Sequence, residues 1–209
     1  MADETRTWAL IHAERSRLAD TIEGLSPEQW STPSLCAGWT VGQLAGHILA
    51  GAEQTPGNFM SGMVKSGFRF NTMMKRDVAS RVHQGQQEIV DRLRKRTTTT
   101  NKPPAPPMAM LGEAVTHGED LRRPIGLTAD VDPEAINACL DMYTKATFPV
   151  GGKKRIQGLR LVTTDTGWSW GSGPEVTGPA LAVLLSMTGR SAALGDLSGD
   201  GADTLRSRL

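Results

Sequence analysis

Cysteine, an excess of one charge and long apolar runs are all scarce in this sequence, and each absence excludes a class of protein. Two cysteines, Cys36 and Cys139, are too few for a disulfide framework and too far apart for a zinc knuckle, so we expect both to be small buried apolar residues. The 23 basic and 22 acidic residues give a formal charge of +1, which offers no electrostatic basis for binding nucleic acid or an anionic membrane. Small molecules or proteins are therefore the expected partners.

Signals for membrane insertion, export and built-in nucleophiles are also missing. No apolar run approaches the roughly 18 residues of a membrane span, and the N-terminus MADETRTW is acidic, unlike a signal peptide. We therefore expect a cytoplasmic protein. The chain has neither the G-x-S-x-G elbow of serine hydrolases nor a Cys-x-x-Cys pair, and this absence fits a thiol supplied by another molecule.

Helical periodicity dominates the first 125 residues. Apolar residues recur at spacings of three, four and seven, and Thr40 with Gln43 three residues later has the pattern of a helix N-cap. The Thr- and Pro-rich stretch TTTTNKPPAPP cannot be helical and is interpreted as a linker. Four amphipathic helices are expected, over residues 5–25, 41–52, 78–96 and 107–124. Burying four apolar stripes together predicts a mainly α, up-down four-helix bundle over residues 1–126.

The last third, residues 127–209, has a different pattern. Asp132 and Pro133 are typical of a helix start, and residues 134–147 are expected to form that helix. The runs GLRLVTTD, GWSW and PEVTG predict short strands of a small antiparallel sheet, and residues 178–189 predict an apolar helix covering it. We therefore expect a small α+β portion at the C-terminal end.

Two of the four histidines lie where chemistry is plausible. His12 lies beside Ile11 and near Arg15, and His83 lies among polar residues; both are interpreted as solvated helix positions. His47 instead lies in the small, apolar stretch LAGHILAGA, which lets another helix or a ligand approach closely. In LGEAVTHGED, Glu113 and His117 are four residues apart and therefore share one helical face. Such a pair could form a surface ion pair, a buried hydrogen bond or two ligands of a metal.

The chemistry of divalent metals makes the third alternative specific. Zinc and related ions accept imidazole nitrogen and carboxylate oxygen, and a catalytic site uses three protein ligands and keeps one position open. Glu-x-x-x-His supplies two ligands from adjacent helical turns, and a third from a facing helix would complete the set. Spacing alone does not choose among the three alternatives.

Three stretches, taken in order, carry a family resemblance. WSTPSLCAGWTVGQLAGHIL, residues 30–49, resembles the entry to the second helix in the mycothiol-dependent maleylpyruvate isomerase branch of the DinB-like superfamily. LGEAVTHGEDLRRPIG, residues 111–126, is similar to the second motif of that branch, and residues 158–190 resemble its C-terminal sheet and helix. The resemblance covers most of the chain.

The resemblance implies a ligand set and roles for two further residues. His47, Glu113 and His117 would be the ligands of a divalent metal, with zinc the first choice. Asp120 would orient an imidazole or fix the end of its helix, the alternative being a salt bridge with Arg122 or Arg123.

Arg190 falls where members of the branch carry an Arg after the last apolar helix. It would anchor a substrate carboxylate, the alternative being an ordinary surface arginine. Trp30 and Trp39 are interpreted as packing residues and turn anchors that could also contact a ligand.

The function that this resemblance implies is a mycothiol-dependent transferase or isomerase. Mycothiol, a low-molecular-weight thiol, would be the cosubstrate and would bind the metal as a thiolate. The sulfur would then attack an electrophilic small molecule and either leave again, giving isomerisation, or stay, giving conjugation. A metal-dependent hydrolase using bound water, a non-catalytic metal-stabilised ligand-binding bundle, and a bundle without metal remain alternatives. No feature of the sequence indicates an oligomeric state.

Overall fold

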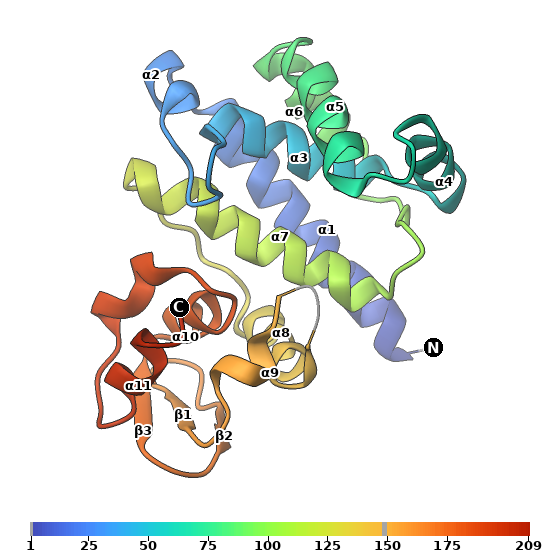
Figure 1. Ribbon diagram of the computed structural model, residues 1–209. Coiled ribbons are helices and arrows are strands. Elements are labelled where there is room, and N and C mark those ends of the chain that lie inside the picture. The colour runs from blue at the N-terminus through green and yellow to red at the C-terminus, as the bar shows by residue number, and fades with distance from the viewer. Residues whose placement is uncertain (1, 148–149) are drawn as a thin grey trace. The chain divides into compact units, whose positions relative to one another are not determined.

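The computed structural model describes residues 2–147 and 150–209, which divide into two compact units between Asp130 and Val131. Within its described residues the first unit contains seven α-helices and one short 3-10 helix (Figure 1). These elements are α1 (Ala2–Glu23), α2 (Pro27–Ser31), α3 (Val41–Glu53), α4 (Pro56–Lys65), α5 (Phe70–Val82), α6 (Gln86–Arg94), α7 (Pro107–Arg122) and η1 (Arg123–Ile125).

Four helices, α1, α3, α6 and α7, contribute the apolar residues of one core cluster. The predicted stripes face this core, because Leu18, Leu44, Leu93 and Leu121 are all fully buried. Figure 1 shows α7 running beside α1, and α3 packs against α7 within the same unit. A mainly α fold with a small C-terminal α+β portion, as predicted, is therefore the observed class.

The start of α3 follows the capping pattern in the sequence. The Thr40 hydroxyl accepts a hydrogen bond from the backbone N–H of Gln43 at 3.2 Å, and the Gln43 side chain accepts one from the Thr40 N–H at 2.9 Å. This reciprocal pair satisfies two backbone donors that the first turn leaves without partners. The cap therefore fixes where α3 begins, and with it the turn of the helix on which His47 lies.

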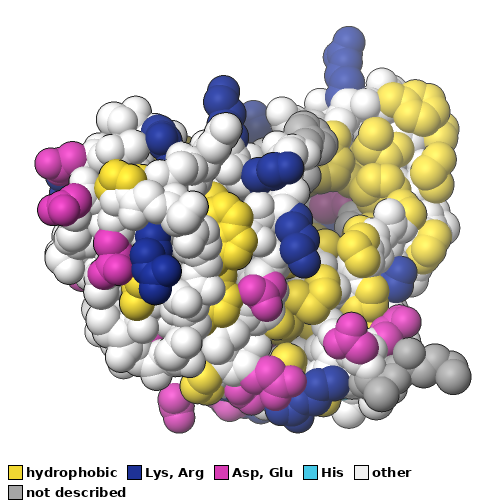
Figure 2. All heavy atoms as spheres, turned by 90° about the horizontal axis from the view of Figure 1, so that it is seen from below, with side chains coloured by type: hydrophobic (Ala, Val, Ile, Leu, Met, Phe, Trp, Pro, Cys, Tyr) yellow, Lys and Arg dark blue, Asp and Glu magenta, His cyan; other side chains and the backbone are white. Residues whose placement is uncertain are grey.

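The region between α3 and α6 differs from the prediction. The single helix expected over residues 78–96 is two helices, because the chain reverses at Gly85, whose φ of +89° favours glycine. The helix α4 was not predicted at all. Its large apolar residues Met60 and Val64 are exposed, so they do not form a buried stripe of the kind on which the prediction depended. Figure 2 shows apolar side chains gathered on its right-hand side, which is also the side on which Figure 1 places α4.

The second unit combines short helices with one sheet. Its elements are α8 (Pro133–Lys145), α9 (Gly152–Arg155), β1 (Arg160–Thr163), β2 (Ser169–Gly171), β3 (Glu175–Gly178), α10 (Ala180–Met187), η2 (Ser191–Asp196) and α11 (Ala202–Arg206). Within the unit α10 packs on β1 and β3, and Leu161 and Val176 are fully buried. The predicted strands and covering helix are present.

The strand order corrects the expected antiparallel sheet. The order is β2-β1-β3, with β1 antiparallel to β2 and parallel to β3. The chain reverses between consecutive strands, so β1 and β3 run in the same direction. Because β1 lies in the middle, its pairing with β3 is parallel, whereas a simple meander would be antiparallel throughout.

No helix in the described ranges combines the length and the apolar character that crossing a membrane requires.

Candidate metal centre

The three predicted ligands come together in the first unit. The Nε2 atom of His47, on α3, lies 3.5 Å from Oε2 of Glu113, on α7. The Nε2 atom of His117, one turn further along α7, lies 3.2 Å from the same oxygen. One ligand atom from each residue lies within 4.8 Å of the others. The side chains thus point to a common position, which is what a shared ion requires.

Burial and charge shape this cluster. The two imidazoles are mostly buried, whereas the Glu113 side chain is 52% exposed, which leaves one side of the cluster accessible. Desolvation raises the pKa of the Glu113 carboxyl, but the charge of His117 and hydrogen bonds from both imidazoles outweigh it, so the pKa lies well below the ordinary value. Glu113 is therefore ionised near neutral pH.

The pKa of His117 is shifted in the opposite direction. Burial lowers the pKa of the His117 imidazole, but the charge of Glu113 and hydrogen bonds to Asp120 and Cys36 outweigh it, so the pKa lies well above its ordinary value. Without an ion the imidazole therefore holds its second proton more tightly than an isolated imidazole does. A metal that binds Nε2 must displace that proton.

Asp120 holds the far side of the His117 ring. Its fully buried Oδ2 lies 2.9 Å from His117 Nδ1 and accepts a hydrogen bond from the Cys36 thiol at 3.2 Å. With the Nδ1 proton donated to Asp120, Nε2 is the nitrogen that faces the position shared with His47 and Glu113, and its lone pair becomes available to a metal that displaces its proton. This arrangement fits the orienting role predicted for Asp120.

Cys36 departs from the expectation of a buried apolar residue. Its sulfur is 3.5 Å from His117 Nδ1, and the thiol contacts the Asp120 carboxylate. A backbone hydrogen bond from the Leu35 N–H to the Asp120 carbonyl at 3.1 Å holds this part of the loop against α7. Cys139, in contrast, is fully buried in the second unit, as expected.

Cys36, His117 and Asp120 form a second group whose ligand atoms also lie within 4.8 Å of one another. Both groups need His117, the first through Nε2 and the second through Nδ1. Asp120 is fully buried, whereas the half-exposed Glu113 opens the first group to solvent. His47, Glu113 and His117 are therefore the better candidates for a catalytic metal site, because a substrate must be able to reach the ion.

Two tryptophans pack around this region. The Trp39 ring lies 5.0 Å from the His47 ring, centroid to centroid, and covers one side of that imidazole. Trp30 lies against Gly42 on α3, where a Cβ would come within 2.3 Å of the indole. Both are partly buried against the core cluster, in keeping with the packing role predicted for them.

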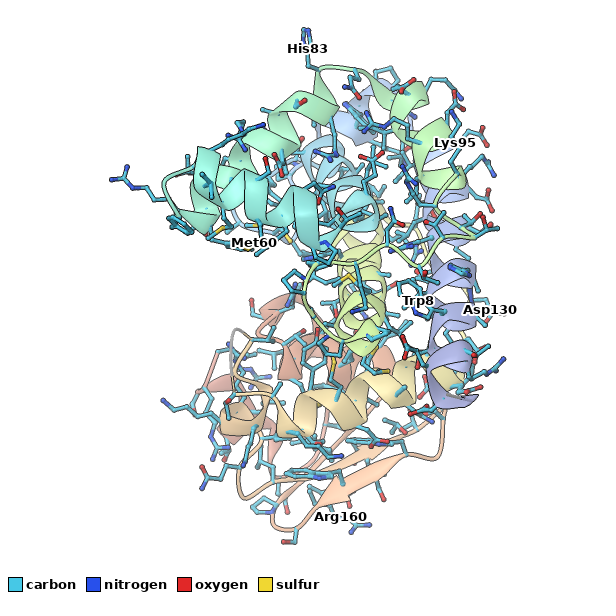
Figure 3. All side chains as sticks on the ribbon, turned by 90° about the vertical axis from the view of Figure 1, so that its right-hand side faces the viewer. Trp8, Met60, His83, Lys95, Asp130 and Arg160 are labelled. Atoms are coloured by element: carbon cyan, nitrogen blue, oxygen red, sulfur yellow. The ribbon has the colours of Figure 1, made fainter. Side chains whose placement is uncertain are left out.

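The remaining predicted residues lie outside the cluster. His83 is exposed, as expected, and Figure 3 shows it projecting from the junction of α5 and α6. His12 is not simply solvated, because its Nε2 lies 3.0 Å from the Thr99 carbonyl. Arg190 belongs to the second unit and donates a hydrogen bond to the Thr188 carbonyl at 2.9 Å. Its role in anchoring a carboxylate stays a prediction.

Replacing Asp120 with asparagine should weaken zinc binding by roughly 10- to 100-fold, the usual effect of losing a partner that orients a ligand. The amide keeps the shape of the side chain but removes the charge that favours the Nδ1–H tautomer of His117. Competition with a chromogenic chelator measures the affinity. Asp20→Asn is the control, because that carboxylate is exposed and pairs with Arg94. Equal affinity in both variants would contradict the role given to Asp120.

Comparison with known proteins places this geometry in context. Residues 11–122 match the family described as the mycothiol maleylpyruvate isomerase N-terminal domain. The chain is also similar to the crystal structure of the mycothiol-dependent maleylpyruvate isomerase, with a TM-score of 0.66 and 14% identity over 95% of this chain and 93% of that one. A histidine-to-alanine mutant of the mycothiol-dependent maleylpyruvate isomerase gives a TM-score of 0.62 and 15% identity with the same coverage. At such identities the likeness shows the fold alone. No curated protein matches the chain.

Proposed function

The chain belongs to the mycothiol maleylpyruvate isomerase N-terminal domain family, and from this premise we propose that it is a metal-dependent thiol transferase or isomerase. Its cosubstrate would be mycothiol and its second substrate an electrophilic small molecule. The observation that carries the proposal is the convergence of His47, Glu113 and His117 on one partly open position.

The donor atoms fit a divalent ion. Two ligand atoms that each lie about 2.0–2.1 Å from a tetrahedral zinc are roughly 3.3 Å apart. The distances from Glu113 Oε2 to the two imidazole nitrogens are 3.5 and 3.2 Å, close to that value. Two imidazoles and one carboxylate are also a common ligand set of catalytic zinc. When bound, such an ion would lower the pKa of a thiol at the open position.

The protein's own side chains prepare the position for that thiol. Asp120 keeps the His117 ring turned toward Glu113, and the Trp39 indole shields one side of His47 from water. Cys36 is held by Asp120 on the far side of the imidazole, so its sulfur is poorly placed to act as the nucleophile. The reacting sulfur is therefore supplied by the cosubstrate.

Two outcomes follow once the thiolate sulfur adds to the electrophilic carbon of a carbon–carbon double bond conjugated to a carbonyl, whose π bond opens to give an enolate. An enolate that re-forms the double bond expels the thiolate, whereas one that takes up a proton keeps the carbon–sulfur bond. If the new carbon–sulfur bond breaks again after rotation about the adjacent bond, the thiol is regenerated and the substrate is isomerised. If the bond stays, the product is a thioether conjugate. We propose that Arg190 binds a carboxylate of the electrophile, as the resemblance implies.

Omitting mycothiol should abolish turnover of the zinc-loaded protein. The assay uses a panel of electrophiles that includes maleylpyruvate, and follows substrate loss and free thiol. We expect mycothiol to support the reaction and an equal concentration of glutathione to give none. Turnover without any thiol would indicate a hydrolase instead. No turnover with any electrophile, in protein that holds zinc, would favour a ligand-binding bundle without catalysis.

A further inference from the structure

A polar pocket of about 210 Å³ lies in the first unit, between the end of α3 and the helices α4 and α5. Whole small-molecule ligands usually fill about 300–1,000 Å³, so this volume suits one part of a ligand. The polar residues that line it and matter here are Gln54, Asn58, Ser61, Lys65, Asp77 and Arg81.

One wall of the pocket is held rigidly by an ion-pair network. Arg81 donates to the Glu53 carboxylate at 3.1 and 3.2 Å and to the Asp77 carbonyl at 2.9 Å. Arg92 binds the same carboxylate at 2.6 and 2.9 Å. In contrast, the side chains of Gln54 and Ser61 have no hydrogen-bond partner among the described residues. The pocket thus presents unused donors and acceptors on a fixed frame.

Charged groups of both signs line the pocket together with neutral polar groups. Arg81 shares the Glu53 carboxylate with Arg92, and the Asp77 carboxylate lies 3.8 Å from the Arg76 guanidinium. Lys65 is the remaining cation of the lining, and it is exposed. The lining thus combines paired guanidinium groups, a carboxylate, amides and a hydroxyl, and such a mixture suits the hydroxyls of a polyol, which both donate and accept.

The pocket and the candidate metal centre share one face of α3. Gln54 follows His47 by seven residues, which places the two side chains within about 20° of each other and roughly 10.5 Å apart along the helix axis. Gly51 lies between them, and a Cβ there would meet nothing within 4 Å. The surface from His47 to Gln54 is therefore open at Gly51.

We propose that this pocket binds the sugar portion of the thiol cosubstrate while the sulfur lies at His47, Glu113 and His117; this inference rests on the proposed function. Mycothiol carries its cysteine in amide linkage to an amino sugar, which is joined to an inositol ring. A cysteinyl group spans about 3.5 Å of extended chain, and the two rings attached beyond it would cover the rest of the roughly 10.5 Å to Gln54. The pocket would then select the thiol by its sugar, and the metal centre would activate its sulfur.

The double variant Gln54→Ala/Asp77→Ala tests this assignment. It removes two polar groups of the pocket and leaves the metal ligands and the Glu53–Arg81 pair in place. We expect the KM for mycothiol to rise about tenfold, the effect of losing two ordinary hydrogen bonds, with kcat little changed. The inhibition constant of N-acetylcysteine, which has no sugar and competes only for the metal position, should not change. The matched control is Gln87→Ala/Asp91→Ala, an exposed amide–acid pair on α6.

Calorimetric titration with the sulfur-free amino sugar–inositol compound separates this inference from the proposed function. Binding by the wild type and by His47→Ala, with about tenfold weaker binding by the double variant, supports the pocket even if no thiol supports turnover. Turnover with mycothiol whose KM is unchanged in the double variant overturns the pocket and leaves the proposed function standing. No turnover and no binding overturns both. Circular dichroism confirms that the double variant is folded.

Discussion

Replacing His47 with alanine should leave the protein without bound zinc and without thiol-dependent turnover. His47 is the one ligand of the proposed set that α3 supplies, and the other two, Glu113 and His117, are neighbours on α7. Without His47 the site retains an acid and an imidazole from a single helix, short of the three protein ligands that catalytic zinc uses. We expect elemental analysis to fall from about one zinc per chain to a trace, and turnover to fall by more than about 100-fold, beyond the loss expected from an orienting partner.

The control for this experiment is His83→Ala, because His83 is exposed at the junction of α5 and α6. That variant should keep its zinc and its turnover. Zinc retained by His47→Ala but lost from Cys36→Ala would instead place the ion between Cys36, His117 and Asp120. That outcome would contradict the proposed ligand set.

The helices that build the site could be predicted because their signals are local. Thr40 and Gln43 mark the start of α3 through a reciprocal cap, and the prolines of the linker mark the start of α7. The spacing of Glu113 and His117 places them on adjacent turns of the same helix. Each of these features depends only on residues within one or two turns.

Other features depend on contacts distant in sequence and were missed or wrong. The helix breaks at Gly85, between α5 and α6. The apolar residues on the two sides of Gly85 keep the same helical spacing, so the spacing predicted a single helix. The parallel pairing of β1 with β3 depends on which side of β1 the third strand occupies, and alternation within each strand carries no such information.

The site shows the same division between local and distant signals. Periodicity placed His47 near a buried stripe, but only family resemblance indicated that it faces Glu113 and His117. Cys36 contacts Asp120 because the loop before α3 is held against α7 through the Leu35 N–H, a contact that spans 85 positions in sequence, from 35 to 120. The composition predicted a buried apolar environment for Cys36, whereas its thiol contacts the polar side chains of Asp120 and His117.

Arg122 was considered only as an alternative partner for Asp120, yet it lies at the centre of a buried charge network. Its side chain has no exposed surface and donates to Glu14 at 2.8 Å and to Glu119 at 3.4 Å. Gly118 makes room for it, because a Cβ there would lie 2.9 Å from the guanidinium. The network joins α1 to α7, the helix that carries Glu113 and His117.

Replacing Arg122 with alanine should lower the free energy of unfolding by about 3–5 kcal/mol, because it removes the fully buried cation that contacts the carboxyl groups of both Glu14 and Glu119. Arg17 and Arg123, which lie 3.5 and 3.7 Å from these two groups, are partly exposed. Urea unfolding followed by the helical circular dichroism signal measures the change. Arg17→Ala is the matched control, since Arg17 is 3.5 Å from Glu14 but 27% of its side chain is exposed. We expect that variant to lose less than about 1 kcal/mol. Similar losses of unfolding free energy in the two variants would show that the burial of Arg122 does not increase its contribution to stability.

The pH dependence of Arg122→Ala identifies the cause of its instability. Burial raises the pKa values of Glu14 and Glu119 above the ordinary 4.5, and the Arg122 charge partly opposes this rise. Without Arg122 both pKa values rise further, so the folded state binds more protons than the unfolded state and its stability falls as pH rises above about 4.5. The variant should therefore differ from the wild type more at pH 7 than at pH 5. A difference independent of pH would instead indicate lost packing around the guanidinium, because a cavity does not titrate.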